Sequence, residues 1–346
     1  MNPPFPGLYM RPNRHSRGTV PAGKPYCVCP DIWPSGTRPI PDYLKTLAEA
    51  DGHHGYKQES RDDIALHRDN YIYVRAKNGA STTQNKFAKL YYATNGIIQW
   101  PSMWQNNVLH TDEGSPQADL GAVPPGAVGV AERPFVWHDV PAPSSGRHYC
   151  LIAQIDDSTD SNPFPEVTSP LDLARLVQRD LGWGWRNVRT VKSSTATWQQ
   201  TVPLDIAQNV DTEHCYNVYV RPVGYEGWSV SFSCSQVDDR GRQIQLPQTR
   251  IEKSGEPLGV EAWLAPGFTS MLTVYMYNTK HKRPVSGAHV EVGAALVPRP
   301  GAELDAAISA GVIDWDLSRR LSAHGPTRTG TEPSPLAPLG SYTLGS

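Results

Sequence analysis

Alternation of large and polar residues is the strongest pattern along the chain, and it predicts β-strands. The stretch 69–79, DNYIYVRAKNG, alternates and stops at Asn-Gly, a common hairpin turn. The stretch 148–155 alternates again, with Tyr149, Leu151 and Ala153 on one face. Further strands are predicted at 87–93, 133–137, 187–193, 201–207, 215–221, 227–236, 242–246, 258–263, 268–277 and 287–297. This succession, with few helices between strands, predicts an all-β protein of two antiparallel β-sandwiches, immunoglobulin-like or jelly-roll-like.

Apolar spacing near 3.6 residues predicts three short helical segments. One lies within 39–52 and ends at Gly52. The second begins at Ser169-Pro170, where Ser169 is expected to cap the helix and Pro170 suits its first turn. The third is one short C-terminal helix. Its expected apolar stripe, which Gly311 interrupts, consists of Leu304, Ile308, Val312, Trp315 and Leu321.

These elements divide the chain into six parts. The expected parts are an extended N-terminal arm at 1–26, a first sandwich at 27–160, a linker with a short helix at 161–182, a second sandwich at 183–300, a helix at 301–323 and a flexible C-terminal tail at 324–346. Both ends are rich in Pro, Gly, Ser or Thr, a composition that buries little core by itself. We expect these arms to dock onto other protein subunits.

Charge and composition narrow the classes of partner. The chain of 346 residues has 32 Lys and Arg against 34 Asp and Glu, a net charge of −2. This balance argues against broad binding to nucleic acid or anionic lipid, which needs a concentrated basic surface. Pro (32) and Gly (29) are abundant, and both residues weaken helices, so a long helical bundle is not expected.

The sequence shows no signal for membrane insertion or for secretion by the usual route. No apolar run approaches the length of about 18 residues that a transmembrane helix needs. The first residues lack the apolar core, roughly 7–15 residues long, of a secretory signal peptide. The location is therefore unknown, and export without a signal peptide, to the outside of the cell or within a particle, is favoured.

Several motifs in the first β region occur in a recognisable order. They are DIW at 31–33, NYIYVRAKNG at 70–79, LYYA at 90–93, PFVW at 134–137 and HYCLIA at 148–153. This succession, over residues 31–155 only, resembles a bacterial CARDB-like domain, an immunoglobulin-like β-sandwich associated with adhesion. The chain departs from that pattern at Gln154, where Arg is commoner, and in its long loops at 94–133. The resemblance implies a binding or scaffolding protein and carries no catalytic residues.

Aromatic residues are the first candidates for contacts with a protein or a glycan. The candidates are Tyr91, Tyr92, Trp100, Trp104, Trp183 and Trp185. Trp100 and Trp104 lie in a long predicted loop, and Gly-Trp-Gly-Trp at 182–185 does not suit a packed helix. Exposed tryptophans at loop tips anchor interfaces. The alternative is that these rings fill the space between the sheets or the domain junction.

Two further sets of residues are weaker candidates, one for a calcium site and one for a disulfide. Asp156, Asp157 and Asp160 follow a strand end, where carboxylates could bind calcium, although a solvated acidic turn is the alternative. Of the five cysteines, Cys215 and Cys234 could form a disulfide across neighbouring strands. Buried free thiols are the alternative. No cofactor other than calcium is suggested.

No catalytic motif stands out, so an enzyme is not expected. GxSxG, a Walker A loop, a Gly-rich dinucleotide loop and CxxC do not occur in the sequence. The sequence favours a non-catalytic binding or scaffolding protein, a structural or adhesion-type component of a secreted or phage-tail-like bacterial assembly. Its expected partners are other protein subunits and a cell-surface ligand. The alternative is a secreted toxin or effector acting on a target cell or membrane, with strands at 258–297 rearranging there.

Overall fold

The computed structural model describes most of the chain. The described residues are 3–60, 64–94, 96–143, 149–156, 164, 166–188, 197–278, 284–285, 287–324 and 333–344. Strands account for 41% of the residues and helices for 11%, and the sheets are antiparallel. The predicted all-β class is therefore confirmed.

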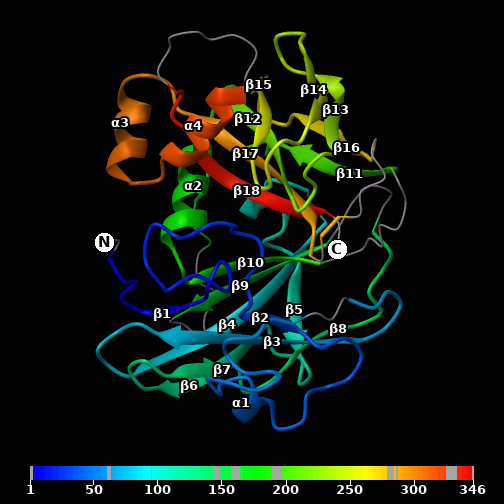
Figure 1. Ribbon diagram of the computed structural model, residues 1–346. Helices are drawn as coiled ribbons and strands as arrows, with labels where there is room; N and C mark the ends of the chain where they lie inside the picture. Colours follow the sequence, from blue (N-terminus) through cyan, green and yellow to red (C-terminus); the bar gives the residue numbers. More distant parts are fainter. Residues whose placement is uncertain are drawn as a thin grey trace.

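The N-terminal half forms an antiparallel sheet of ten strands (Figure 1). Its strands are β1 (Leu8–Tyr9), β2 (Ile32–Pro34), β3 (Asn70–Asn78), β4 (Gln84–Ala93), β5 (Val108–Thr111), β6 (Gln117–Val123), β7 (Val128–Val130), β8 (Phe135–Trp137), β9 (Cys150–Asp156) and β10 (Trp183–Asn187). The main path runs β1-β3-β8-β5-β4-β9-β10, while β2 and β7 pair with β3, and β6 pairs with β4. The sheet thus brings Leu8 and Tyr9 beside the end of β3.

The C-terminal half forms two four-stranded antiparallel sheets. The strands of the first sheet are, in spatial order, β11 (Thr197–Asp205), β16 (Thr269–Tyr277), β13 (Ser229–Val237) and β14 (Gln243–Arg250). The second is β15 (Leu258–Leu264), β12 (His214–Val223), β17 (His289–Val297) and β18 (Ala337–Leu344). Alternate residues of both sheets, such as Leu272 in β16 and Val292 in β17, enter one hydrophobic cluster. The two sheets therefore pack face to face, because each must cover an apolar face.

The helices are α1 (Tyr43–Thr46), α2 (Pro170–Arg179), α3 (Ala302–Ser309) and α4 (Trp315–His324). A single 3₁₀ turn, η1, spans Pro101–Met103. Only one turn of helix forms within the stretch 39–52. The predicted cap of α2 is confirmed, because Asp172 N donates to Ser169 Oγ at 3.2 Å.

The single helix expected at 301–323 is wrong, since the chain forms two helices there. Gly311, between α3 and α4, has a φ of +62°, a left-handed conformation that glycine adopts without strain. A new helix then starts after Asp314, whose Oδ1 accepts a hydrogen bond from Leu317 N at 2.9 Å. Ala307 of α3 belongs to the large hydrophobic cluster, whereas Leu317 and Leu321 of α4 belong to a small one with Tyr219 and Ala295.

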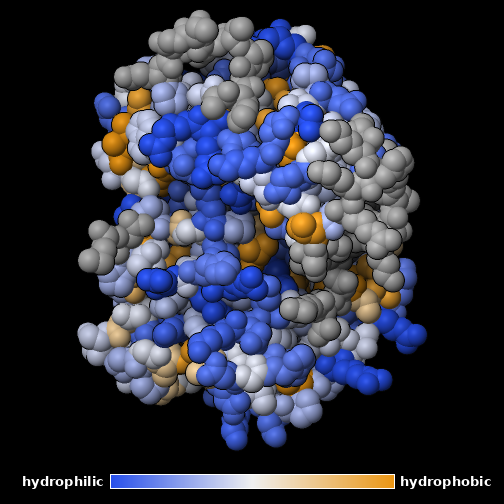
Figure 2. All heavy atoms as spheres, in the orientation of Figure 1, coloured by the Kyte–Doolittle hydropathy of each residue, from blue (hydrophilic) through white to orange (hydrophobic). Residues whose placement is uncertain are grey.

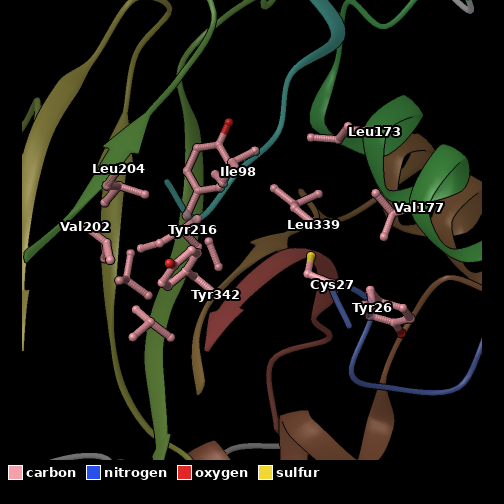
Figure 3. Packing of buried hydrophobic residues seen from close by; sticks show 14 of the residues in the cluster. Tyr26, Cys27, Ile98, Leu173, Val177, Val202, Leu204, Tyr216, Leu339 and Tyr342 are labelled. Carbon is pink, nitrogen blue, oxygen red and sulfur yellow. The ribbon is translucent and has the colours of Figure 1, made fainter. Parts of the chain in front are cut away.

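One hydrophobic cluster joins the two halves of the molecule. It contains Tyr91 and Ile152 of the N-terminal sheet, Leu173 of α2, Val218 of β12 and Leu339 of β18. Figure 3 shows part of this cluster, with residues of several elements directed toward one another. The expected division into two β-sandwich domains is therefore not confirmed, because the two halves share this cluster.

The strand β9 is buried on both of its faces. Ile152 points into the cluster shared with the C-terminal half, whereas Leu151 belongs to a second cluster with Ile72 of β3 and Leu90 of β4. The sheet around β4 and β9 is consequently a middle layer of the molecule. This layer positions Tyr91 of β4 and, on the neighbouring strand β10, Trp183 and Trp185.

The N-terminal arm is built into the fold. Met10 N donates to Leu181 O at 2.8 Å, and Ala22 N donates to Gln178 O at 2.6 Å. β1 pairs with β3, and Figure 3 places Tyr26 and Cys27 near Leu339. The backbone groups of this Pro-rich segment therefore find their partners within the chain, so the prediction of an extended arm is wrong for residues 3–26.

The predicted flexible tail is also wrong where the structure describes it. Residues 337–344 form β18, which pairs with β17 from Val290↔Leu344 to Leu296↔Ala337. Leu339 and Tyr342 are each 1% exposed. A register shift opposite Ala294 and Ala295 breaks the strict alternation in β18. That shift keeps the apolar residues on one face although their spacing in the sequence is irregular.

Candidate contact surface and polar pocket

Five of the six predicted aromatic contact residues lie in the core. Their exposed fractions are 3% for Tyr91, 0% for Trp100, 1% for Trp104, 5% for Trp183 and 3% for Trp185. Tyr92 is half-buried, with its ring centroid 4.6 Å from that of Trp137. The expectation that these residues form an exposed contact surface is therefore wrong, and the alternative reading is correct.

Four of these rings form one packed aromatic group. Tyr91 and Trp104 have centroids 5.4 Å apart, and Trp104 and Trp183 are 5.8 Å apart. Trp185 follows at 6.3 Å from Trp183. Trp100 lies at the junction of the two halves, because its Nε1 donates to Asp205 O of β11 at 3.1 Å. The rings touch one another directly and stabilise the core.

The candidate calcium residues are only partly described. Asp156, at the end of β9, is 2% exposed, and its Oδ2 lies 3.0 Å from Lys89 Nζ. Asp157 and Asp160 lie outside the described residues. Within the described ranges, no group of three or more His, Cys, Asp or Glu side chains is arranged to hold a metal ion. A calcium site in this loop stays a prediction.

The predicted Cys215–Cys234 disulfide is wrong. All five cysteines are free and buried. Cys215 belongs to β12 and Cys234 to β13, and these strands lie in different sheets. Burial raises the pKa of each of the two thiols to about 12. Both therefore behave as small buried apolar groups.

A shallow polar pocket lies where two loops meet beside β3 and β8. Its lining residues are Thr37, His67, Arg68, Asp69 and Asp139. His67 N donates to Val140 O at 2.7 Å, and Asp139 N donates to Asp69 Oδ1 at 3.0 Å. The φ angles of His67 and Asp139 are +56° and +40°, a left-handed backbone that is uncommon for residues with a side chain. The hydrogen bonds between the loops hold this conformation.

The chemistry of the pocket suits a polar ligand. His138 Nδ1 lies 3.0 Å from Asp69 Oδ2. This hydrogen bond, together with that from Asp139 N, lowers the pKa of Asp69. The lining side chains are exposed, so they face water rather than a dry cavity. Such a pocket can bind a small polar molecule, whereas catalysis by a His–Asp pair gains most where water is excluded.

Each helix of the pair α3–α4 exposes one large apolar side chain. Ile308 is 48% exposed and Trp315 is 47% exposed, and Figure 2 shows apolar surface over α3. Trp315 is the one tryptophan among the exposed large apolar side chains of the described chain. We name Ile308 and Trp315 the α3–α4 surface.

The sequence pattern predicts both residues of the α3–α4 surface in the apolar stripe of one helix, whereas both are exposed and lie on two helices. The break at Gly311 places Ile308 in α3 and Trp315 in α4, whereas Val312 and Leu321 of the same predicted stripe are buried, at 0% and 7% exposed. A signal was present in Gly311 itself, because a glycine followed by a new capping residue, Asp314, marks the start of a second helix.

None of the helices in the described ranges has the length and apolar character needed to cross a membrane. No protein family matches the sequence, and no curated protein matches it.

Comparison with solved structures finds weak likenesses. Red sea bream transglutaminase aligns at 10% identity and a TM-score of 0.19, covering 68% of this chain and 28% of that one. The chain thus spans little more than a quarter of that protein. The Enterococcus faecalis MSCRAMM ACE aligns at 10% identity and a TM-score of 0.16, covering 67% and 84%. The enterotoxigenic E. coli adhesin CfaE aligns at 8% identity and a TM-score of 0.17, covering 87% and 89%.

Proposed function

We propose that this chain is a non-catalytic binding and scaffolding protein, a structural or adhesion-type component of a secreted or phage-tail-like bacterial assembly. The observation that carries the proposal is the α3–α4 surface. Ile308 and Trp315 are each about half exposed, and Trp315 is the one aromatic side chain among the exposed large apolar residues of the described chain. Tryptophan is the residue most enriched at the energetic centres of protein interfaces.

The construction of the molecule supports this role. The shared core, the paired N-terminal arm and β18 tie distant parts of the chain into one body. A rigid body loses little conformational freedom when it binds, which favours assembly. The arms are already paired within the chain, so the α3–α4 surface replaces them as the proposed docking site for other subunits. The polar pocket is the proposed site for a cell-surface ligand with polar groups.

The alternative function, a toxin whose strands rearrange at a membrane, has less support. β16 pairs with both β11 and β13, and β17 pairs with both β12 and β18. Each strand would have to break two ladders of hydrogen bonds to leave its sheet. Liposome leakage caused by the purified protein would favour this alternative over the scaffold.

Sedimentation tests the proposal. Native lysate and culture supernatant are separated on a gradient, and this chain is located by immunoblotting. We expect it to travel with particles far heavier than the 38.1 kDa chain. Migration near 38.1 kDa in both fractions would overturn the proposal. The Trp315→Ala variant, prepared in the same host, should leave the heavy fraction if the α3–α4 surface is the docking site.

A further inference from the structure

The N-terminal arm meets the start of α4 through a lysine and an aspartate. Lys24 Nζ forms an ion pair with Asp314 Oδ2, and the two side chains are 23% and 11% exposed. Residue 24 belongs to the arm, whereas Asp314 directly precedes α4. The contact therefore joins the N-terminal arm to the start of α4, elements that lie 290 residues apart in the sequence.

The two oxygens of Asp314 have different surroundings. Oδ1 accepts a hydrogen bond from Leu317 N at 2.9 Å. Oδ2 is buried, and its partner among the described residues is Lys24 Nζ alone. The carboxyl carbon thus carries one oxygen held by a backbone N–H group and one oxygen that faces an amine.

The surroundings of Lys24 make its amine easier to deprotonate. Burial lowers the pKa of this amine to about 8. The cations Arg221 and Arg320 lower it further, whereas the carboxylates of Glu291 and Asp316 oppose the shift. A neutral amine is a nucleophile, and an ammonium is not.

We propose that Lys24 and Asp314 form an intramolecular amide bond that covalently links the N-terminal arm to the start of α4. Nζ of Lys24 attacks Cγ of Asp314, and a Cγ–N bond forms. The bond from Cγ to Oδ2 breaks. One proton passes from the Lys24 ammonium to Oδ2 before the attack and makes the amine neutral, and a second proton follows the attack. Oδ2 leaves as water, and the third hydrogen stays on the amide nitrogen. The charges of the pair cancel, and no oxidant or cofactor is needed.

The geometry assists each part of this reaction. The N–H group of Leu317 stabilises the negative charge that develops on Oδ1 during attack. The fold holds the amine against the carboxyl group, which replaces an encounter in solution by a reaction within one molecule. The product keeps Oδ1 as the amide oxygen, so the hydrogen bond that caps α4 is retained.

The mass of the full-length, denatured protein tests the proposal. We expect the intact mass to be lower than that of the sequence by one water molecule. Protease digestion should give one branched peptide that joins residues 24 and 314. An intact mass equal to that of the sequence would overturn the proposal, and so would a missing water located elsewhere in the chain.

Two variants and one chemical treatment sharpen the result. Lys24→Arg keeps the positive charge but cannot form the amide, so the intact mass of this variant should equal that of its sequence. Lys89→Arg is the matched control, because Lys89 also lies against a buried carboxylate, that of Asp156 at 3.0 Å, and it should leave the missing water unchanged. A succinimide at Asp314 also lacks one water, but hydroxylamine opens it and it gives no branched peptide. That outcome would overturn the cross-link.

Discussion

Asp31 and Arg75 form an ion pair in which neither side chain is exposed. Arg75 Nε lies 3.1 Å from Asp31 Oδ1, and both exposed fractions are 0%. Arg11 binds the same carboxylate through Nε at 3.0 Å. The other nitrogens of Arg75 donate to backbone carbonyls, among them those of Leu47 at 3.0 Å and Gln58 at 2.7 Å. The carboxylate thus joins the N-terminal arm to β3, and Arg75 extends the network to the loop after α1.

Replacement of this carboxylate should strongly destabilise the fold. Asp31→Asn leaves two buried guanidinium groups without their counter-charge, and removing one partner of such a pair costs about 3–5 kcal/mol. Urea denaturation measures the loss. Asp51→Asn is the control, because the pair of Asp51 with Lys57 is exposed and should contribute less than about 1 kcal/mol. Equal losses in the two variants would contradict the structural role of Asp31.

Trp104 should be a core residue rather than a binding residue. Trp104→Ala removes a ring that packs on Tyr91 and Trp183, and such truncations cost about 3–5 kcal/mol. Thermal or chemical denaturation measures this effect. The exposed Trp315→Ala should change stability by only about 0.5 kcal/mol. A Trp104→Ala protein of unchanged stability would contradict the packing described for this ring.

Trp315 should determine assembly. Trp315→Ala is expected to shift the chain from the heavy fraction of a gradient toward free protein while its melting temperature stays unchanged. Leu44→Ala is the matched control, because Leu44 is 49% exposed and lies on α1, far along the chain from α4. If both variants leave the heavy fraction, or if neither does, the α3–α4 surface is not the docking site.

The five cysteines should resist thiol reagents in the folded protein. Burial raises the pKa of Cys27, Cys29, Cys215 and Cys234 to about 12 and that of Cys150 well above its ordinary value. Because the thiolate is the reactive form, a disulfide reagent should label none of them at neutral pH and all of them after unfolding. Fast labelling of one native cysteine would show that its side chain is reachable.

The same thiols make stability depend on alkaline pH. In the unfolded chain they ionise near 9.0, whereas in the folded chain four of them ionise near 12. Between these values the folded state binds more protons, so the free energy of unfolding should fall as the pH rises above 9.0. Urea denaturation on either side of this pH measures the slope. The double variant Cys27→Ala and Cys29→Ala should show a shallower fall.

Local patterns in the sequence predict the central strands well. The predicted strand 69–79 corresponds to β3, and 148–155 overlaps β9. Ser169 caps α2, as the sequence Ser169-Pro170 predicts. These elements follow from residues close together in the chain, since alternation and capping are local properties.

The burial of the tryptophans and the tail strand depends on contacts between distant residues. Trp100 is buried because Asp205, more than a hundred residues later, accepts its hydrogen bond. The apolar residues of β18 reach one face only through a register shift opposite β17. The polar pocket likewise forms because pairing of β3 with β8 brings Asp69 to His138. No local pattern contains this information.

The position of β18 has a consequence for folding during synthesis. β17 pairs with β12 on one side and with Ala337–Leu344 on the other. Until the ribosome has released that later segment, β17 has an open edge and the apolar face that Leu339 covers is bare. The sheet of the C-terminal half therefore stays incomplete during synthesis until the segment Ala337–Leu344 has left the ribosome and pairs with β17. Chains stopped before that residue should be substrates for chaperones or prone to aggregate.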